Sequence, residues 1–275
     1  MFQDNNLLLL MFAILPAVFY SLIIHHKAPD GIVKRKPMWS YIIIGFLSIQ
    51  ILTIIHMLFP HIQSHIEYQT IIYDLGNGIT KLVEEPTVYA IFIFAFFQVA
   101  FFEELSKWFA FRVGKAARGD TRDGKDSPFA VMFYSIMIAV GFAAFENVHY
   151  VGRALWGDLK GVDPHQMLLI RSLNSVVVHM ISGLFMGYFI ALGRRFKNIF
   201  KHAGYTILGL LTASAFHGLY DFNLMKPGTM DDYTTILGIH FHTTNNLLII
   251  FALFVSYLMA NHLSKISYNN NGLLR

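Results

Sequence analysis

The chain has 275 residues, of which 55% are hydrophobic and only 14% are charged, and its mean hydropathy is +0.50. Soluble domains carry about 25% charged residues, so this composition excludes an ordinary cytosolic enzyme, a disordered chain and a nucleic-acid-binding domain. The net charge of +4 fits the loop asymmetry of a membrane protein, and the absence of cysteine excludes disulfides, thiolate nucleophiles and cysteine-bound metals.

Seven segments are long and apolar enough to cross a membrane, since a span needs about 20 predominantly apolar residues. In chain order they cover residues 7–24, 41–59, 88–111, 129–151, 167–192, 205–222 and 246–262. The first segment has no basic residue before it, and Lys27 follows it, so we interpret it as an uncleaved span rather than a signal peptide. The sequence therefore predicts an all-α, polytopic transmembrane bundle of about seven helices.

The loops predict the orientation of this bundle. Lysine and arginine are concentrated at 27–36, 112–125, 194–201 and 265–275, which follow alternate spans. Because basic residues favour the cytoplasmic side, we expect the N-terminus outside and the C-terminus inside. The longest loop, 60–86, has room for a short interfacial helix. No loop is long enough for a soluble domain, so residues 1–275 are expected to form one membrane-embedded domain.

Ionisable side chains occur inside four consecutive predicted spans. A charge at the centre of a membrane helix costs about 2.5–3.5 kcal/mol on insertion scales, and such residues are usually functional. In this sequence the ionisable residues inside spans are Glu103, Glu104 and Lys107 in the third span, Glu146 and His149 in the fourth, His179 in the fifth, and His217 and Asp221 in the sixth.

Small or polar residues share a helical face with these groups, because residues four apart lie on one side of a helix. The stripes are Ser135, Ala139, Ala143 and Glu146 in the fourth span, Arg171, Ser175, His179 and Gly183 in the fifth, and Gly209, Ala213, His217 and Asp221 in the sixth. Small residues let membrane helices approach closely. We therefore expect the ionisable groups to face one shared, hydrated cavity.

A structural interpretation competes with this one. Glu103 and Lys107 are four apart and would form an intrahelical salt bridge, and a single histidine in a bundle is usually only hydrogen-bonded. The whole set on four spans favours a functional site, since acids and imidazoles inside a membrane are energetically unfavourable and are usually retained because they serve a function.

The motifs of several intramembrane protease classes are absent from the sequence. It contains no H-E-x-x-H zinc motif and no G-x-G-D, and Ser182 lacks the glycine turn that exposes a serine nucleophile. The residues instead favour a carboxylate–imidazole site. In such a site Glu103 or Glu104 takes a proton from water. His179 and His217 position that water, donate to the oxyanion and protonate the leaving amine, while Asp221 orients His217.

A metal is the open alternative. Glu146 and His149 have the Glu-x-x-His spacing of di-metal sites in helical bundles, and Glu/His ligation suits zinc with an open water position. The residues do not separate a metal-free mechanism from a zinc-dependent one. The metal-free version, with no cofactor, is preferred here.

Four motifs, one in each of spans three to six, resemble the PrsW family of intramembrane proteases, within the superfamily of CAAX-prenyl endopeptidases and bacteriocin-processing proteins. The matching residues are Glu103, Glu104 and Lys107 in E-E-x-x-K, Phe145, Glu146 and Asn147 in F-E-N, His179, and His217, Tyr220 and Asp221 in H-x-x-Y-D. The resemblance covers roughly 88–222, the expected catalytic core. Each motif alone is weak, but four in order are specific.

This resemblance implies an endopeptidase that cuts membrane-anchored proteins or peptides, such as an anti-sigma factor or another signalling protein, in a prokaryotic cell (inner) membrane. It implies that the glutamate pair activates water and that the later histidines assist. Phe145 and His149 also fit the F-x-x-x-H pattern of the CAAX-type relatives. Because the superfamily includes a non-catalytic scaffold, a scaffold remains a competing function. A proton-coupled transporter is another, since transporters use acid/histidine relays.

Overall fold

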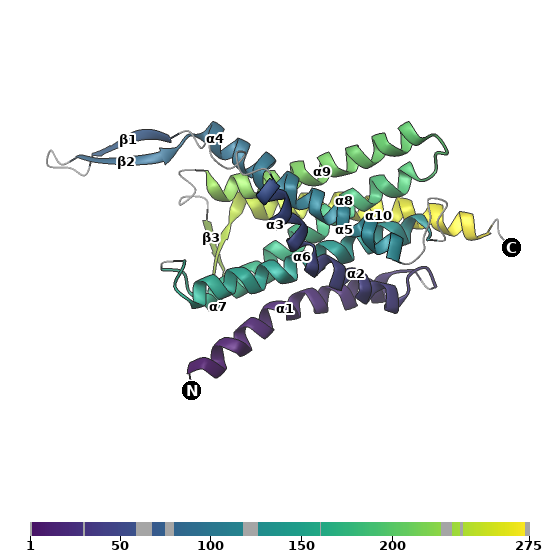
Figure 1. Cartoon of the computed structure of the whole chain (residues 1–275), viewed down its shortest axis with the longest axis horizontal. Coiled ribbons are helices and arrows are strands. Elements are labelled where there is room, and N and C mark those ends of the chain that lie inside the picture. The colour runs from purple at the N-terminus through teal and green to yellow at the C-terminus, as the bar shows by residue number, and fades with distance from the viewer. Residues whose placement is uncertain are drawn as a thin grey trace.

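The computed structural model describes residues 2–29, 31–58, 68–74, 80–117, 126–159, 161–226, 233–236 and 239–272, and long helices aligned with its longest axis dominate it (Figure 1). The helices are α1 (Phe2–Lys27), α2 (Arg35–Leu47), α3 (Ile49–Leu58), α4 (Val88–Ile93), α5 (Phe101–Ala117), α6 (Pro128–Leu155), α7 (Pro164–Ile170), α8 (Val176–Gly193), α9 (Ile199–Met225) and α10 (Thr243–Gly272). Two π-helical segments, η2 (Phe94–Ala100) and η3 (Arg171–Ser175), join α4 to α5 and α7 to α8.

The predicted all-α membrane bundle is confirmed. Six helical stretches among the described residues are long and apolar enough to cross a membrane, and they contain six of the seven predicted spans. The remaining prediction, 205–222, lies in α9, which is 27 residues long. This helix carries His217 and Asp221, which make it less apolar than the other six, but it lies beside α8 along the bundle (Figure 1).

Two parts of the chain differ from the sequence-based expectation. Within the predicted span 41–59, a single turn residue, Ser48, lies between α2 and α3 and its hydroxyl donates to the Gly45 carbonyl at 2.6 Å, while the stretch Arg35–Leu58 is still long enough to cross a membrane. Where the 60–86 loop is described, it forms an antiparallel hairpin of β1 (Tyr68–Asp74) and β2 (Thr80–Pro86) instead of a short helix. A second hairpin, β3 (Tyr233–Ile236) and β4 (Ile239–His242), precedes α10.

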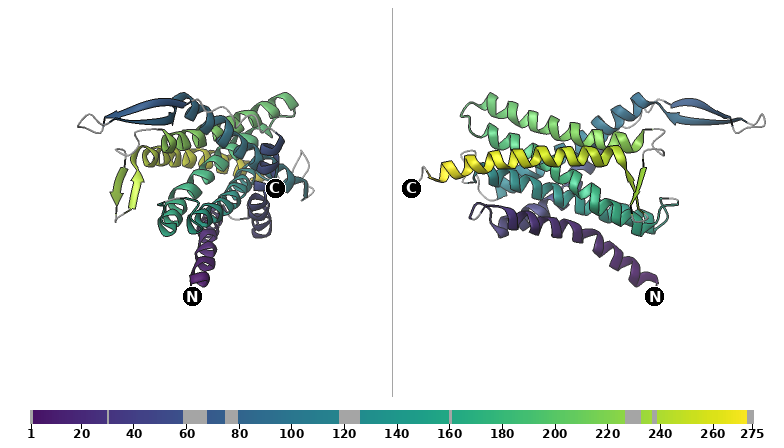
Figure 2. Two further views of the ribbon diagram at one scale, coloured as in Figure 1. Left: turned by 60° about the vertical axis from the view of Figure 1, so that its left-hand side comes forward. Right: turned by 180° about the vertical axis from the view of Figure 1, so that it is seen from behind.

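The two ends of the chain lie at opposite ends of the bundle. Figure 2 shows the start of α1 on the side of the hairpins and the end of α10 on the other side. This placement is what an odd number of spans requires. Which end faces the cytoplasm stays a prediction from the basic loops.

Helix α6 forms the centre of the bundle. In its most apolar stretch 83% of the residues are buried, against 22% in α1 and in α10. Helices α1, α2 and α8 all pack against α6, and α9 packs against α8 on the far side. Helices α1 and α10 therefore present most of their apolar surface to lipid, while α6 supplies the packed core.

Two glycines set the closest helix crossing, between α2 and α6. A Cβ on Gly45 would overlap the carbonyl of Ile138, and a Cβ on Gly141 would overlap the carbonyl of Ile42. Each helix therefore rests on the bare backbone of the other. This is the close approach that small residues allow in membrane bundles.

Gly141→Ala is expected to destabilise the protein by about 1–3 kcal/mol, because the added methyl group meets backbone that cannot rotate away. Gly204→Ala in α9 is the control, since its Cβ would meet nothing within 4 Å and alanine favours the helix by up to about 1 kcal/mol. Unfolding of both variants in detergent micelles measures the difference. Equal stability of the two variants would contradict this packing.

Candidate active site

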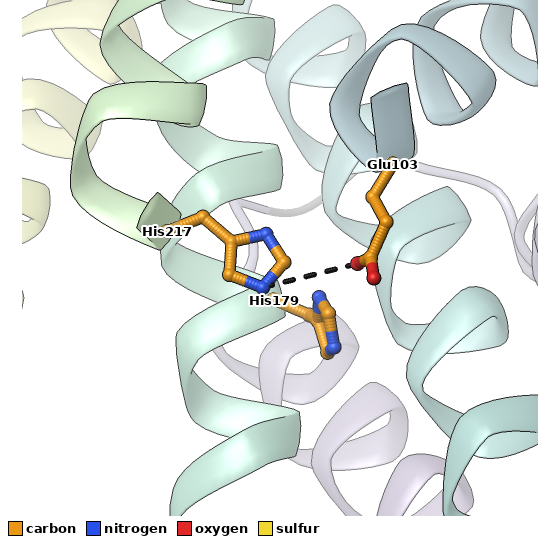
Figure 3. Close-up of side chains that lie close together, drawn as sticks. All are labelled: Glu103, His179 and His217. Carbon is orange, nitrogen blue, oxygen red and sulfur yellow. Dashed lines mark ion pairs between the residues drawn. The ribbon is translucent and has the colours of Figure 1, made fainter. Parts of the chain in front are cut away.

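The structure brings together all of the predicted site residues except His149. Glu103, Glu104 and Lys107 come from α5, Glu146 from α6, His179 from α8, and His217 and Asp221 from α9. Figure 3 shows the Glu103 carboxylate pointing toward the rings of His179 and His217. The cluster is buried midway along the bundle, as Glu103 lies near the middle of the continuous helix Val88–Ala117.

Glycines bring the helices that carry these residues close to one another. A Cβ on Gly183, one turn after His179, would lie 2.7 Å from the Ala139 side chain of α6. A Cβ on Gly218, next to His217, would lie 2.8 Å from the Phe96 ring of η2. The predicted small-residue stripe of α8 therefore does face α6, and Gly218 lets α9 lie close against η2.

A π-helical segment comes shortly before the site residue on two of these helices. Segment η2 ends three residues before Glu103, and η3 ends four residues before His179. A π-turn adds a residue to the turn and shifts the faces of the helix on either side, and such turns are frequent at functional sites. In this way α5 and α8 aim polar side chains inward without interrupting the spans.

Lys107 lies at the centre of the cluster and is only 2% exposed. Its Nζ donates to Glu104 Oε1 at 2.7 Å and to His179 Nδ1 at 2.9 Å, and it lies 3.7 Å from Glu103 Oε2. The ammonium also lies 4.3 Å from the centre of the Phe142 ring. A single buried cation thus holds three of the polar groups in place.

His217 is fixed by carboxylates on both sides. Its Nδ1 is 2.9 Å from Glu104 Oε1, while its Nε2 is 3.5 Å from Asp221 Oδ2 and 3.8 Å from Glu103 Oε2. The ring stands nearly perpendicular to the His179 ring, at 85° and 4.8 Å between centres. A carboxylate on one nitrogen orients the other nitrogen toward the reacting groups.

His179 connects the cluster to an ion pair between Glu146, a predicted site residue, and Arg171, which was not predicted as one. Because a lysine ammonium has no acceptor, His179 accepts at Nδ1 and donates from Nε2 to Glu146 Oε2 at 2.7 Å. Arg171 donates to the same oxygen at 2.9 Å and to Asn147 Oδ1 at 3.0 Å, and its guanidinium lies 4.1 Å from the Tyr150 ring. Arg171 therefore anchors Glu146 and Asn147 of the F-E-N motif.

A cavity of about 490 Å³ reaches the cluster from the side of α3, η2 and α6. Glu103 and Glu146 line it, together with Tyr150 and the exposed His149, which contacts the Tyr150 ring but lies outside the cluster. Three polar atoms of its lining are buried without a hydrogen-bond partner among the described residues: Glu103 Oε2, Gln98 Oε1 and His56 Nε2. Buried polar groups are normally satisfied, so these atoms indicate a place for water and for a polar ligand.

Glu103, His179 and His217 each offer a ligand atom, and these atoms lie within 4.8 Å of one another. Two histidines and a glutamate are the protein ligands of many catalytic zinc sites, and Glu103 Oε2 has no hydrogen bond within the described part of the chain. The donor set therefore fits a divalent cation. Binding requires one exchange, since both His179 nitrogens already have partners in Lys107 and Glu146. The Glu146/His149 pair is not part of this donor set.

Comparisons with known proteins agree with these observations. Residues 37–259 match the family described as "PrsW family intramembrane metalloprotease". The chain is 30% identical to Protease PrsW of Oceanobacillus iheyensis over 135 residues, which is 49% of this chain and 56% of that protein. It is 29% identical to Protease PrsW of Clostridioides difficile over 94 residues, 34% of this chain and 37% of that protein. The matches thus span about half or less of these relatives, and no solved structure matches significantly.

Proposed function

The chain belongs to the PrsW family of intramembrane metalloproteases, and from this membership we propose that it hydrolyses a peptide bond of a membrane-anchored protein within the bilayer. The observation that carries the proposal is the Glu103 carboxylate. It is buried, its Oε2 has no hydrogen bond among the described residues, and it faces the cavity beside His217. A carboxylate in this setting is placed to act on a water molecule.

In the proposed reaction Glu103 removes a proton from water, and the resulting oxygen nucleophile attacks the carbonyl carbon of the scissile peptide. The C–N bond then breaks, and His217 or the protonated Glu103 delivers a proton to the leaving nitrogen. The buried Lys107 ammonium, 3.7 Å from Glu103 Oε2, stabilises negative charge that develops in this low-dielectric site. The products are a carboxylate and an amine, so no oxidant or reductant is needed.

The other residues position these groups. Glu104 is fully buried and accepts from both Lys107 and His217, so it fixes the cation and the imidazole rather than meeting water. Asp221 holds the second nitrogen of His217. Glu146 and Arg171 hold His179. We assign the base role to Glu103 because, of the two adjacent glutamates, it is the one that lines the cavity.

A metal ion at this site would be held by Glu103, His179 and His217, and when bound it would polarise the scissile carbonyl as a Lewis acid. The metal-free version remains our proposal, since both nitrogens of His179 are occupied by protein partners. Cleavage that persists after exhaustive chelation supports it. Loss of cleavage on chelation, restored by zinc, supports a zinc-dependent form.

Proteoliposomes that contain the full chain and a single-span reporter protein test the proposed function. We expect the wild type to cleave the reporter within its membrane segment, with both fragments seen by mass spectrometry. Proton flux without cleavage in the same vesicles would instead support the competing function of a proton-coupled transporter. Binding of the reporter with neither activity would support the scaffold.

Gln98 and His56 lie on different walls of the cavity, on η2 and α3, and we propose that their unpartnered atoms bind the peptide backbone of the substrate. Gln98→Leu is expected to raise KM about tenfold while kcat changes much less, because a ground-state hydrogen bond is lost. The control is Gln166→Leu, an exposed glutamine of α7 outside the cavity. Unchanged KM in Gln98→Leu would contradict this role.

Three further features are proposed with this function. Residues 88–222 form the catalytic core of a single membrane domain, the protein lies in a prokaryotic inner membrane with its N-terminus outside, and its substrate is a signalling protein such as an anti-sigma factor. The basic loops support the orientation, and the motifs of spans three to six support the core.

A further inference from the structure

A second cavity, of about 350 Å³, is lined by residues near the ends of α5 and α8 and the start of α9. Apolar side chains such as Trp108 and Ile207 form most of its wall. Its polar lining is mainly basic and comprises Arg112, Lys115, Arg194 and His202, together with Thr206. No acidic side chain is among its lining residues. The cavity therefore combines an apolar wall with positive charge from α5 and from Arg194 at the end of α8.

Arg194 is the basic residue that most clearly indicates a missing ligand. Its Nη1 is buried and has no hydrogen-bond partner among the described residues. A buried donor without a partner is costly, and a guanidinium is suited to phosphate oxygens, which it can bind through two parallel hydrogen bonds. A phosphate group in this cavity would pair with the positive charge of the Arg194 guanidinium and would accept a hydrogen bond from its buried Nη1.

The apolar wall shows what kind of phosphate fits. Ile199 and Ile207 line the cavity and are 56% and 57% exposed, so the cavity opens along a face that lies against lipid tails in a membrane-spanning chain. A free phosphate ion would leave this apolar wall uncovered. The cavity also lies at the end of the bundle that carries the basic loop 194–201, and basic pockets between membrane helices bind anionic head groups.

We propose that this cavity binds an anionic phospholipid, with the phosphate at Arg194 and Arg112 and an acyl chain along Trp108 and Ile207. The site lies outside the Glu103 cluster and stands independently of the proposed protease activity. The lipid is bound as a structural ligand between α5, α8 and α9.

Native mass spectrometry of the full chain, purified in detergent and titrated with phosphatidylglycerol or phosphatidylcholine, tests the proposal. We expect the wild type to retain phosphatidylglycerol in preference to phosphatidylcholine. Arg194→Gln is expected to weaken phosphatidylglycerol binding about fivefold, which corresponds to one cation near a lipid surface. Arg195→Gln is the matched control, because this neighbouring arginine is exposed and lies outside the cavity.

A second variant keeps every charge. Ala203→Phe fills the cavity from an exposed position of α9, and we expect it to displace the lipid without unfolding the protein. Equal weakening by Arg194→Gln and Arg195→Gln would show a diffuse charge effect and overturn the proposal. Equal retention of the two lipids, or displacement of the lipid by millimolar inorganic phosphate alone, would also overturn it.

Discussion

Glu103→Gln is expected to reduce kcat for cleavage by about 10³- to 10⁴-fold, at the upper end of what a positioned general base contributes. Glutamine has nearly the same shape but does not accept the proton from water. The fold should persist, because Glu103 Oε2 has no hydrogen bond among the described residues and the Glu104–Lys107–His217 contacts stay in place. Reporter cleavage in proteoliposomes measures the rate, and thermal unfolding confirms the fold.

Two further variants separate the roles of the adjacent glutamates. Glu103→Asp keeps a carboxylate at a longer distance and should retain more activity than Glu103→Gln. Glu104→Gln should lower the stability as well as the rate, since Glu104 accepts hydrogen bonds from Lys107 and His217. If Glu103→Gln cleaves at the wild-type rate, the base lies elsewhere.

Lys107→Met is expected to destabilise the protein by about 3–5 kcal/mol, the cost of removing one partner from a buried ion pair. The loss leaves Glu104, which is fully buried, without its cation, and leaves His179 Nδ1 without its donor. Equilibrium unfolding in mixed micelles measures the change. The effect is large because the same ammonium contacts residues of both α5 and α8.

Lys201→Met is the control for this variant, since Lys201 is exposed and lies 5.4 Å from the Phe196 ring. Its removal should change stability by no more than about 1 kcal/mol. The double variant Lys107→Met with Glu104→Gln should recover part of the loss, because it removes the uncompensated charge together with its partner. Equal stability of the two lysine variants would contradict a central role for Lys107.

The sequence contains enough information for the bundle and for most of the site. Apolar segments of span length predict membrane helices because apolar side chains are stable in the hydrocarbon core. Charged residues inside such segments are rare, so each one stands out in the sequence. Glycine and alanine beside those charges predicted the faces that meet, as the contact of Gly183 with α6 confirms. The resemblance to PrsW proteases is confirmed by the family match over residues 37–259.

Other features depend on tertiary contacts that spacing does not encode. Arg171 lies one turn before Ser175 on the predicted His179 stripe, but the stripe does not identify its partner, and only the fold places it against Glu146. His149 fits two motifs, but it is exposed and lines the outer part of the cavity, while Glu146, three residues earlier, bonds to His179 within the cluster. The turn at Ser48 places the hydroxyl and the backbone N–H of this residue on the Gly45 carbonyl, and neither contact can be seen in the apolar pattern of the span.

The adjacent glutamates could not be told apart from the sequence. Residues one apart on a helix point in directions about 100° apart, so only one of them can face the cavity while the other faces the core. Which of them does so depends on the rotation of α5, and η2 shifts this rotation by its π-turn. The structure turns Glu104 toward Lys107 and His217, and leaves Glu103 at the cavity.

Hydrolysis in oxygen-18 water tests most directly whether this buried cluster activates water. The full chain and a single-span reporter are incubated in proteoliposomes, and the mass of the N-terminal fragment, which ends in the new carboxylate, is measured. We expect one oxygen-18 atom in the new carboxylate after one turnover of the wild type, and no such fragment from Glu103→Gln. A folded wild type that yields no labelled fragment, or a Glu103→Gln variant that yields it at the same rate, would contradict the proposed mechanism.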